Sequence, residues 1–225
     1  MNIVKAYYIL NMKMLIKDKL SFIWAIFLPS TLFIFNTKEF YDVIDMRFYW
    51  AYIIFSAYVF GVGLHSLNLK EQGTLKTYFS IRESRVELFV ANILTQITFS
   101  FISIFFFNLF SYLTIKTDIW LMLIYSIILI FAAIPVAFLF FSVTLIKNVH
   151  YNSLNTLMMI LTIICMFVIQ TDSYLNYINP LNYISNILMI NSIGMMGIYV
   201  ITSIIFILIG MYSIKRFSII SNEVR

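Results

Sequence analysis

Cysteine, glycine and charged residues are scarce in this 225-residue chain, and each shortage excludes a class of function. The single cysteine, Cys165, cannot form an internal disulfide and is best explained by packing, because a free thiol behaves as a small hydrophobe. The six glycines form no phosphate-binding loop, so the chain does not bind ATP through such a motif. Neither His65 nor His150 has a carboxylate or cysteine neighbour at ligand spacing, so we predict no metal site.

Charge makes up only 11% of the residues, whereas 62% are hydrophobic. A soluble domain of this length could not bury so much apolar surface, but a lipid bilayer can serve as the solvent. Continuous apolar runs without strict alternation indicate helices. We therefore predict an all-α integral membrane protein, a single domain over residues 1–225 with six spans. The predicted spans are Phe22–Thr37, Tyr49–Asn68, Leu88–Ile115, Ile119–Ile146, Leu154–Thr171 and Gly194–Ile214.

No Asp, Glu, Lys or Arg lies well inside any of these runs. Carriers driven by protons or sodium usually place such a group near the membrane midplane. The energy for any transport must therefore come from another source. Pro29 and Pro135 lie inside the first and fourth spans and should kink them.

Basic residues orient the chain. With the amino terminus in the cytoplasm, twelve of the fifteen Lys and Arg lie on the inner side and three on the outer side, in accordance with the positive-inside rule. Both termini are then cytoplasmic. The net charge of +5 reflects this topology, together with attraction to anionic lipid, and requires no nucleic acid.

Residues 2–18 form a moderately amphipathic stretch. Lysines gather on one side of its helical wheel, and Ile3, Tyr7, Leu10 and Met14 gather on the other. Such a helix would lie on the inner leaflet. A plain extension of the first span is the alternative.

The inner loop over residues 69–87 is the most highly charged connection. Gly73 is a natural break, Thr74 can cap a short helix over residues 75–80, and Leu75 with Phe79 would form its apolar side. Ser84 and Glu87 form a capping-box pattern at the start of the third span. We read the loop as a structured docking element; a solvated loop is the alternative.

The outer segment over residues 172–193 contains no Lys or Arg and is rich in Leu, Ile and Tyr. Asn179 followed by Pro180 is typical of a helix start. A helix over residues 180–191 would be about 18 Å long, too short to span. We predict a re-entrant or surface-lying helix within residues 179–192.

Two spans carry polar faces. In the fifth span a stripe at helical spacing could line a substrate path, and its amides and methionines would suit a soft cavity. It consists of Asn155, Met159, Thr162, Met166 and Gln170. In the third span Asn92, Gln96, Ser100 and Ser103 share a face, for which helix–helix packing is the favoured explanation.

Taken in order, these features resemble the membrane-spanning subunit of an ABC exporter of the ABC-2 type, over the whole chain. The resemblance rests on residues 2–18, Trp24 with the mid-span Pro29, the Glu…Gly-Thr-Leu…Ser-Arg pattern of the inner loop from Glu71 to Arg85, and Asn179-Pro180-Leu181-Asn182-Tyr183.

The resemblance implies that residues 70–83 are a coupling helix that sits in a groove of a separate cytoplasmic ATPase, which would hold ATP and Mg²⁺. The chain itself would bind no cofactor and would not be an enzyme. The implied coupling residues are Lys70, Glu71, Gly73, Thr74, Leu75, Lys76, Phe79 and Arg82. Two membrane subunits, identical or similar, would form a dimer around one pathway, with spans one and five near the axis and spans two and five facing the substrate. Asn179, Pro180 and Tyr183 would belong to a re-entrant hairpin that closes the exit.

The expected function is ATP-driven export of amphipathic or hydrophobic substrates through the cell membrane. A highly charged substrate would require basic groups that the path lacks. Small hydrophobic or amphipathic peptides are favoured by the short outer loops and the apolar interior. The bias toward Ile, Asn, Lys and Phe suggests a Gram-positive bacterium, and exporters of cytolytic peptides or bacteriocins fit this description. The alternatives are export of drugs or lipid-linked compounds, a non-transporting immunity or scaffold protein, and a secondary transporter.

Overall fold

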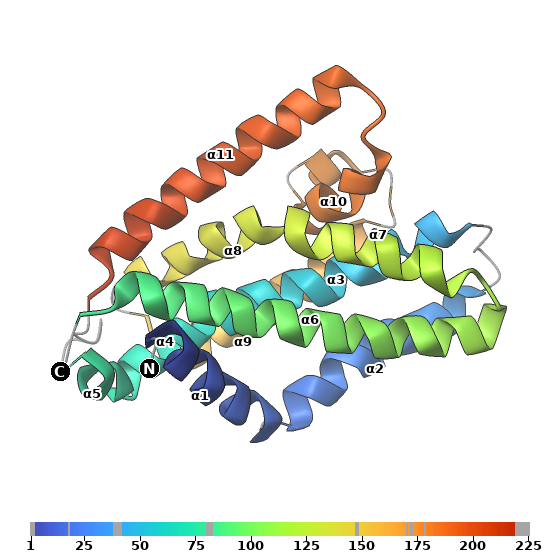
Figure 1. The fold of residues 1–225 in the computed structure, drawn as a ribbon. Helices are drawn as coiled ribbons and strands as arrows, with labels where there is room; N and C mark the ends of the chain where they lie inside the picture. Colours follow the sequence, from blue (N-terminus) through green and yellow to red (C-terminus); the bar gives the residue numbers. More distant parts are fainter. Residues whose placement is uncertain are drawn as a thin grey trace.

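The computed structural model describes residues 3–17, 19–37, 42–79, 83–146, 149–169, 171, 173–177 and 179–218, and helices make up nearly all of these ranges (Figure 1). The α-helices are α1 (Ile3–Lys17), α2 (Lys19–Asn36), α3 (Arg47–Tyr58), α4 (His65–Glu71), α5 (Thr74–Phe79), α6 (Arg85–Ile115), α7 (Ile119–Ala132), α8 (Ile134–Phe141), α9 (Tyr151–Val168), α10 (Pro180–Ser185) and α11 (Ile193–Arg216). Shorter helical segments are η2 (Val43–Met46), the π-helix η3 (Val59–Leu64), η4 (Ser142–Leu145), η5 (Tyr174–Tyr177) and η6 (Asn186–Met189).

Five helical segments in the described part of the chain are long and apolar enough to cross a membrane. They are Val43–Glu71, Arg85–Ile115, Ile119–Leu145, Tyr151–Val168 and Ile193–Arg216. They correspond to the last five predicted spans, and the fold agrees with an all-α multi-pass membrane protein. The first predicted span, Phe22–Thr37, falls in α2, whose apolar part Ile23–Asn36 is shorter than the other five. The sixth crossing stays a prediction.

The long helices run roughly along one direction and give the molecule two ends (Figure 1). The α5 end is the one at which α1 begins, α5 lies and α11 ends; the far end carries the connection between α6 and α7. Helices α3, α6 and the α7–α8 pair contact one another, and α1 and α2 form a V that packs on α6. Helix α11 packs against α8 near the α5 end and leans away from the bundle toward the far end, where α10 lies beside it.

Aromatic side chains join α2 to α3 and α6. The ring of Phe33 on α2 lies edge-on to Tyr49 and Phe107, with centroid distances of 6.0 and 5.9 Å. Tyr49 and Phe107 stack on each other at 5.6 Å. Edge-to-face and offset pairs of this kind add to the stabilisation from burial. Helix α2 is thereby fixed to α3 and α6.

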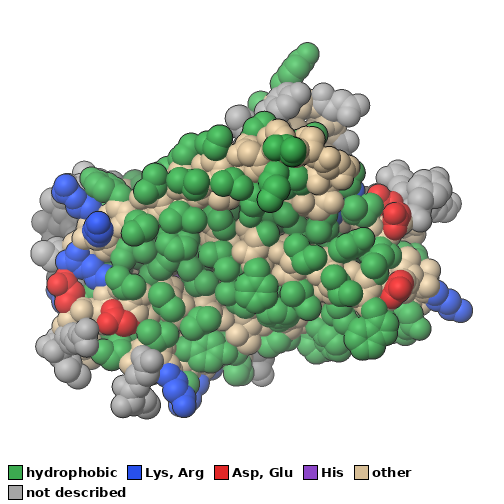
Figure 2. All heavy atoms as spheres, turned by 45° about the horizontal axis from the view of Figure 1, so that its top comes forward, with side chains coloured by type: hydrophobic (Ala, Val, Ile, Leu, Met, Phe, Trp, Pro, Cys, Tyr) green, Lys and Arg blue, Asp and Glu red, His purple; other side chains and the backbone are tan. Residues whose placement is uncertain are grey.

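The face of the molecule shown in Figure 2 is mainly hydrophobic along its length, and Lys, Arg, Asp and Glu gather at its two ends. This distribution is the one that a bilayer selects, because charged groups avoid the hydrocarbon core. The α5 end carries most of the basic side chains in this view.

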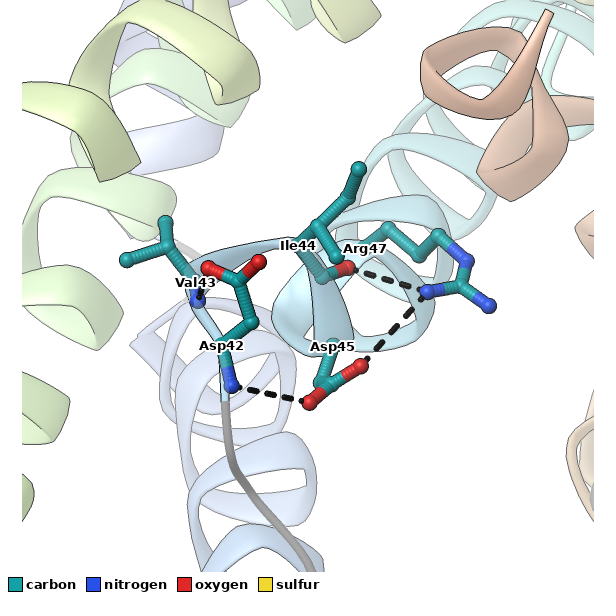
Figure 3. A network of polar contacts seen from close by, with 5 residues as sticks. All are labelled: Asp42, Val43, Ile44, Asp45 and Arg47. Carbon is teal, nitrogen blue, oxygen red and sulfur yellow. Dashed lines mark hydrogen bonds and ion pairs between the residues drawn. The ribbon is translucent and has the colours of Figure 1, made fainter. Parts of the chain in front are cut away.

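A compact polar network starts the Val43–Glu71 segment at the far end (Figure 3). Asp42 accepts a hydrogen bond from the Val43 amide at 2.6 Å, and Asp45 accepts one from the Asp42 amide at 3.1 Å. Arg47 pairs with Asp45 at 3.8 Å and donates to the Ile44 carbonyl at 3.2 Å. The first amides of the segment are thus satisfied before the chain enters the apolar core.

The two predicted kinks differ. The fourth span is interrupted at Ala133, two residues before Pro135, and continues as α8. Helix α2, in contrast, continues through Pro29. The predicted helix over residues 180–191 is divided into α10 and the short segment η6, which ends at Met189.

Candidate functional site

The candidate site is the α5 junction, which we define as α5 with the ends of α1, α4, α6, α9 and α11 around it. The chain enters α5 through Gly73, whose φ of +72° lies in the left-handed region that only glycine adopts at little cost. The Gly73 amide donates to the Lys70 carbonyl at 3.2 Å. This turn sets the direction in which α5 leaves α4.

Helix α5 has two different sides, as the sequence predicts. Leu75 is fully buried and Phe79 is 6% exposed, and both belong to the main hydrophobic core. Lys76 and Thr77 are exposed. The apolar side therefore anchors α5, and the polar side is presented to the surroundings.

Tyr7 ties α5 to α1, a contact that the sequence did not reveal. Its hydroxyl lies 2.6 Å from the Ser84 hydroxyl and donates to the Tyr78 carbonyl at 3.4 Å. The Tyr7 and Tyr78 rings also lie 5.4 Å apart. Burial, with a smaller contribution from Tyr7, raises the pKa of Tyr78. Helices α1 and α5 are thus held together.

The predicted capping box at the start of α6 is wrong. Ser84 occupies the N-cap position, but its side chain makes no capping hydrogen bond and instead contacts Tyr7. The hydroxyl can satisfy only a few partners, and here a tertiary contact outcompetes the local one. Helix α6 nevertheless begins at Arg85, directly after the predicted cap.

Glu71 joins α4 to α9. Its carboxylate accepts a hydrogen bond from the backbone amide of Tyr151, the first residue of α9, at 2.7 Å. A carboxylate is favoured at a helix N-terminus because the amides there lack acceptors and carry partial positive charge. Helix α4, which leads into α5 through Gly73, is thereby connected by one side chain to α9, on which the predicted path lies.

Lys70 faces inward and is only 2% exposed. Its ammonium group donates to the Thr144 carbonyl at 3.4 Å and lies 5.8 Å from the ring centre of Phe217. It thus holds the α5 junction together and is not presented to a partner. The sequence suggested otherwise, because a lysine in a charged loop is normally read as exposed. The predicted coupling residue Arg82 lies outside the described residues.

Arg85 adds α11 to the junction. Its guanidinium group forms an ion pair with Glu83 and donates a hydrogen bond to the backbone carbonyl of Lys215, near the end of α11. The exposed polar residues on and next to α5 include Gln72, Lys76, Thr77 and Glu83. This small polar surface, next to the ends of α1, α4, α6, α9 and α11, is what the junction offers to a partner.

The predicted path stripe on α9 does not line an open space as a unit. Thr162 and Met166 are buried at 3% and 5% exposure, whereas Met159 is 51% exposed. The Asn155 amide lies 3.9 Å from the Met159 sulfur. Gln170 lies outside the described residues.

An open hollow of about 880 Å³ lies along the other side of α9. Asn152, Ser153, Thr156, Leu157, Ile160, Leu161 and Ile164 line it. Helical spacing predicts which residues share a face of α9 but not what that face contacts. The predicted stripe and the observed hollow therefore lie on different sides of the helix.

The predicted exit residues form a tight cluster between α9, α10 and α11. Asn179 caps α10 by accepting from the Leu181 amide at 3.0 Å, as predicted, and also donates to the Cys165 carbonyl at 2.8 Å. Pro180 is the first residue of α10. The Tyr183 hydroxyl lies 2.7 Å from the Ser203 hydroxyl on α11.

The polar row on α6 is buried inside the protein, in agreement with a packing role. Asn92 bonds to Asn11 on α1 and to Ser66 on α4, at 2.7 and 2.8 Å. Further along, Asn108 accepts from the Trp50 indole at 2.7 Å. These bonds between buried side chains hold the helices together inside the protein.

In the described part of the chain, no three His, Cys, Asp or Glu side chains are grouped so that they could hold a metal ion. Comparisons of the chain with protein-family models, with curated proteins and with solved structures found no match.

Proposed function

We propose that the chain is the membrane subunit of an ATP-driven exporter of the ABC-2 type, and that a separate ATPase binds at the α5 junction. The observation that carries the proposal is the pairing of an exposed polar side on α5 with a firmly anchored apolar side. A partner that pushed on α5 would displace α1, α4 and α9 through Tyr7 and Glu71. A flexible loop could not transmit force in this way.

In this proposal the α5 end is cytoplasmic. With six spans, twelve of the fifteen basic residues would lie on that side of the membrane, in accordance with the positive-inside rule. Counting α2 as a crossing gives six spans and puts both termini on the inner side. The second membrane subunit would be a copy of this chain or a similar one.

The substrate in this proposal is amphipathic or apolar, with a peptide favoured. The exposed part of α9 presents short polar side chains near Tyr151, such as Asn152 and Thr156, and aliphatic ones beyond them, such as Ile160. It carries no Lys, Arg, Asp or Glu between Tyr151 and Val168. An anionic substrate would find no cation there.

The test has two steps. The tagged chain is purified in mild detergent from its own cells, and we expect a soluble ATPase with a phosphate-binding loop to co-purify at near-equal stoichiometry. ATP hydrolysis by the complex in liposomes is then measured with and without hydrophobic peptides. The same measurement is made with apolar drugs and lipids. Absence of the ATPase, or a rate of hydrolysis that none of these compounds changes, would contradict the proposal.

Lys76→Glu is the sharpest variant, because Lys76 is exposed on the polar side of α5. Reversal of one interface charge should weaken ATPase binding by about tenfold. Lys13→Glu is the matched control, with the same change at an exposed lysine of α1. Equal binding by both variants would exclude α5 as the docking helix.

A further inference from the structure

The most buried span contains a π-helix, Val59–Leu64, between α3 and α4. A π-helix carries hydrogen bonds to the fifth preceding residue, is rare, and is frequently found at functional sites. Val59, Val62, Gly63 and Leu64 are all buried, so this segment is not a frayed end. It lies among packed neighbours that must accommodate it.

Two glycines let those neighbours approach. A methyl group added at Gly63 would lie 2.3 Å from the backbone oxygen of Phe140 on α8. One added at Gly61 would lie 2.0 Å from the Gln96 side chain of α6. The π-helix is thus in direct backbone contact with a second helix.

A line of buried side chains connects the π-helix to α1. Ser66 donates to the Val62 carbonyl inside the π-helix at 2.7 Å. Asn92 donates to the Ser66 hydroxyl at 2.8 Å, and Asn11 on α1 donates to Asn92 at 2.7 Å. Asn11 is 3% exposed, and Ser66 and Asn92 are fully buried. Three consecutive hydrogen bonds therefore lead from the first helix to one carbonyl of the π-helix.

A second interruption lies alongside the first. The Tyr58 hydroxyl, immediately before the π-helix, donates to the Ile130 carbonyl at 2.7 Å, three residues before the break at Ala133. The Tyr199 hydroxyl of α11 donates to the Ala132 carbonyl at 2.6 Å. Two adjacent spans are therefore irregular over the same stretch. Tyrosine hydroxyls donate hydrogen bonds to two backbone carbonyls of α7, just before its interruption.

We propose that Val59–Leu64 and the break at Ala133 form a joint inside the membrane domain. At this joint α4, α5 and α8 change their angle against α3 and α7, and the hydrogen bonds from Asn11 through Asn92 to Ser66 hold one setting of it. This proposal rests on the proposed function in one respect, namely that an ATPase would supply the force that moves α5. The joint itself belongs to this chain.

The test measures the distance between spin labels at Thr77→Cys on α5 and Leu113→Cys near the far end of α6, in a Cys165→Ser background in lipid nanodiscs. Thr77 and Leu113 are exposed. Ser66→Ala removes the acceptor of Asn92 and the donor to Val62, and should raise the population of a second distance about fivefold. Asn11→Leu should do the same from α1.

Ser213→Ala is the matched control. Ser213 is also fully buried and also donates to the carbonyl four residues earlier, Ile209, at 2.8 Å, but in the uninterrupted helix α11. Identical distances in the parent, Ser66→Ala and Ser213→Ala would overturn the joint. A change with Ser66→Ala but none with Asn11→Leu would overturn the control by α1.

Hydrogen exchange on the unmodified chain gives a readout that does not depend on any variant folding. The amides of Val59–Leu64 should exchange faster than those of the equally buried α3. Equal protection would overturn the joint. Neither measurement includes an ATPase, so failure of the ATPase to bind would refute the proposed function and leave the joint standing.

Discussion

The Val43–Glu71 segment and α11 are both apolar enough to cross a membrane, but they are opposites in their surroundings. Within the most apolar part of each, 78% of the first is buried in the protein and 11% of the second. Trp50 is fully buried, whereas Ile201 is 61% exposed. Figure 1 shows α11 leaning out of the bundle while α3 runs through its middle.

The two surroundings differ in whether they can supply hydrogen-bond partners to polar groups and irregular backbone. In hydrocarbon every backbone group must be paired, and a helix that faces lipid has only itself to supply the partners. Helix α11 is accordingly regular from Ile193 to Arg216. The buried segment contains a π-helix, and Ser66, four residues further along the same segment, donates a hydrogen bond to its Val62 carbonyl. Of these two segments, the irregular one is the one that protein, not lipid, surrounds.

The largest expected effect comes from the two tryptophans at opposite extremes of burial. Trp50 is fully buried and donates to Asn108 at 2.7 Å, whereas Trp120 on α7 is 74% exposed. Trp50→Ala should lower the free energy of unfolding by about 3–5 kcal/mol and Trp120→Ala by less than about 1 kcal/mol. Unfolding by SDS in mixed micelles measures both. Equal losses in the free energy of unfolding would contradict the difference in surroundings between the two tryptophans.

Glycine substitutions should have the next largest effect and should differ in sign. Gly63→Ala must move the backbone of Phe140, at a cost of about 1–3 kcal/mol. Gly197 on α11 has no neighbouring atom within 4 Å of an added methyl group. Gly197→Ala should therefore stabilise by up to about 1 kcal/mol through helix propensity. The same unfolding assay applies, and a loss at Gly197 would mean that another surface covers α11.

Removal of one hydroxyl tests the helix break. Tyr199→Phe leaves the Ala132 carbonyl without its 2.6 Å partner and should cost about 1 kcal/mol. Tyr212→Phe, at a 56% exposed position on the same helix, should change stability very little. If the two variants melt at the same temperature in nanodiscs, Tyr199 does not support the break.

The smallest effect is expected on the exposed side of α11. Ile201→Ala should alter the free energy of unfolding by no more than about 0.5 kcal/mol, because lipid surrounds the side chain in both states. A loss above about 2 kcal/mol in the SDS titration would indicate that protein covers this position, as in a dimer.

The sequence predicted local features well. The apolar runs located the long helices to within a few residues, and Gly73 with Leu75 and Phe79 indicated α5 and its anchored side. These features depend on neighbouring residues, so periodicity and turn chemistry are sufficient.

Features that depend on distant residues were not predictable. Ser84 bonds to Tyr7 rather than to its own helix, and Lys70 is buried by helices far along the chain. The π-helix gives no stronger local signal than the spacing of Gly61 and Gly63. On α9 the polar spacing predicted a face, but packing decided that Thr162 is buried.

The central claim is that α5 is presented on the cytoplasmic side, where an ATPase can reach it. The most direct measurement is the labelling of Thr77→Cys, in the Cys165→Ser background, with a maleimide that cannot cross membranes. Tyr174→Cys, at an 88% exposed position in η5, is the control for the opposite side. We predict that Thr77→Cys reacts in inside-out vesicles and not in intact cells, and that Tyr174→Cys does the reverse. Labelling of Thr77→Cys in intact cells would contradict the account.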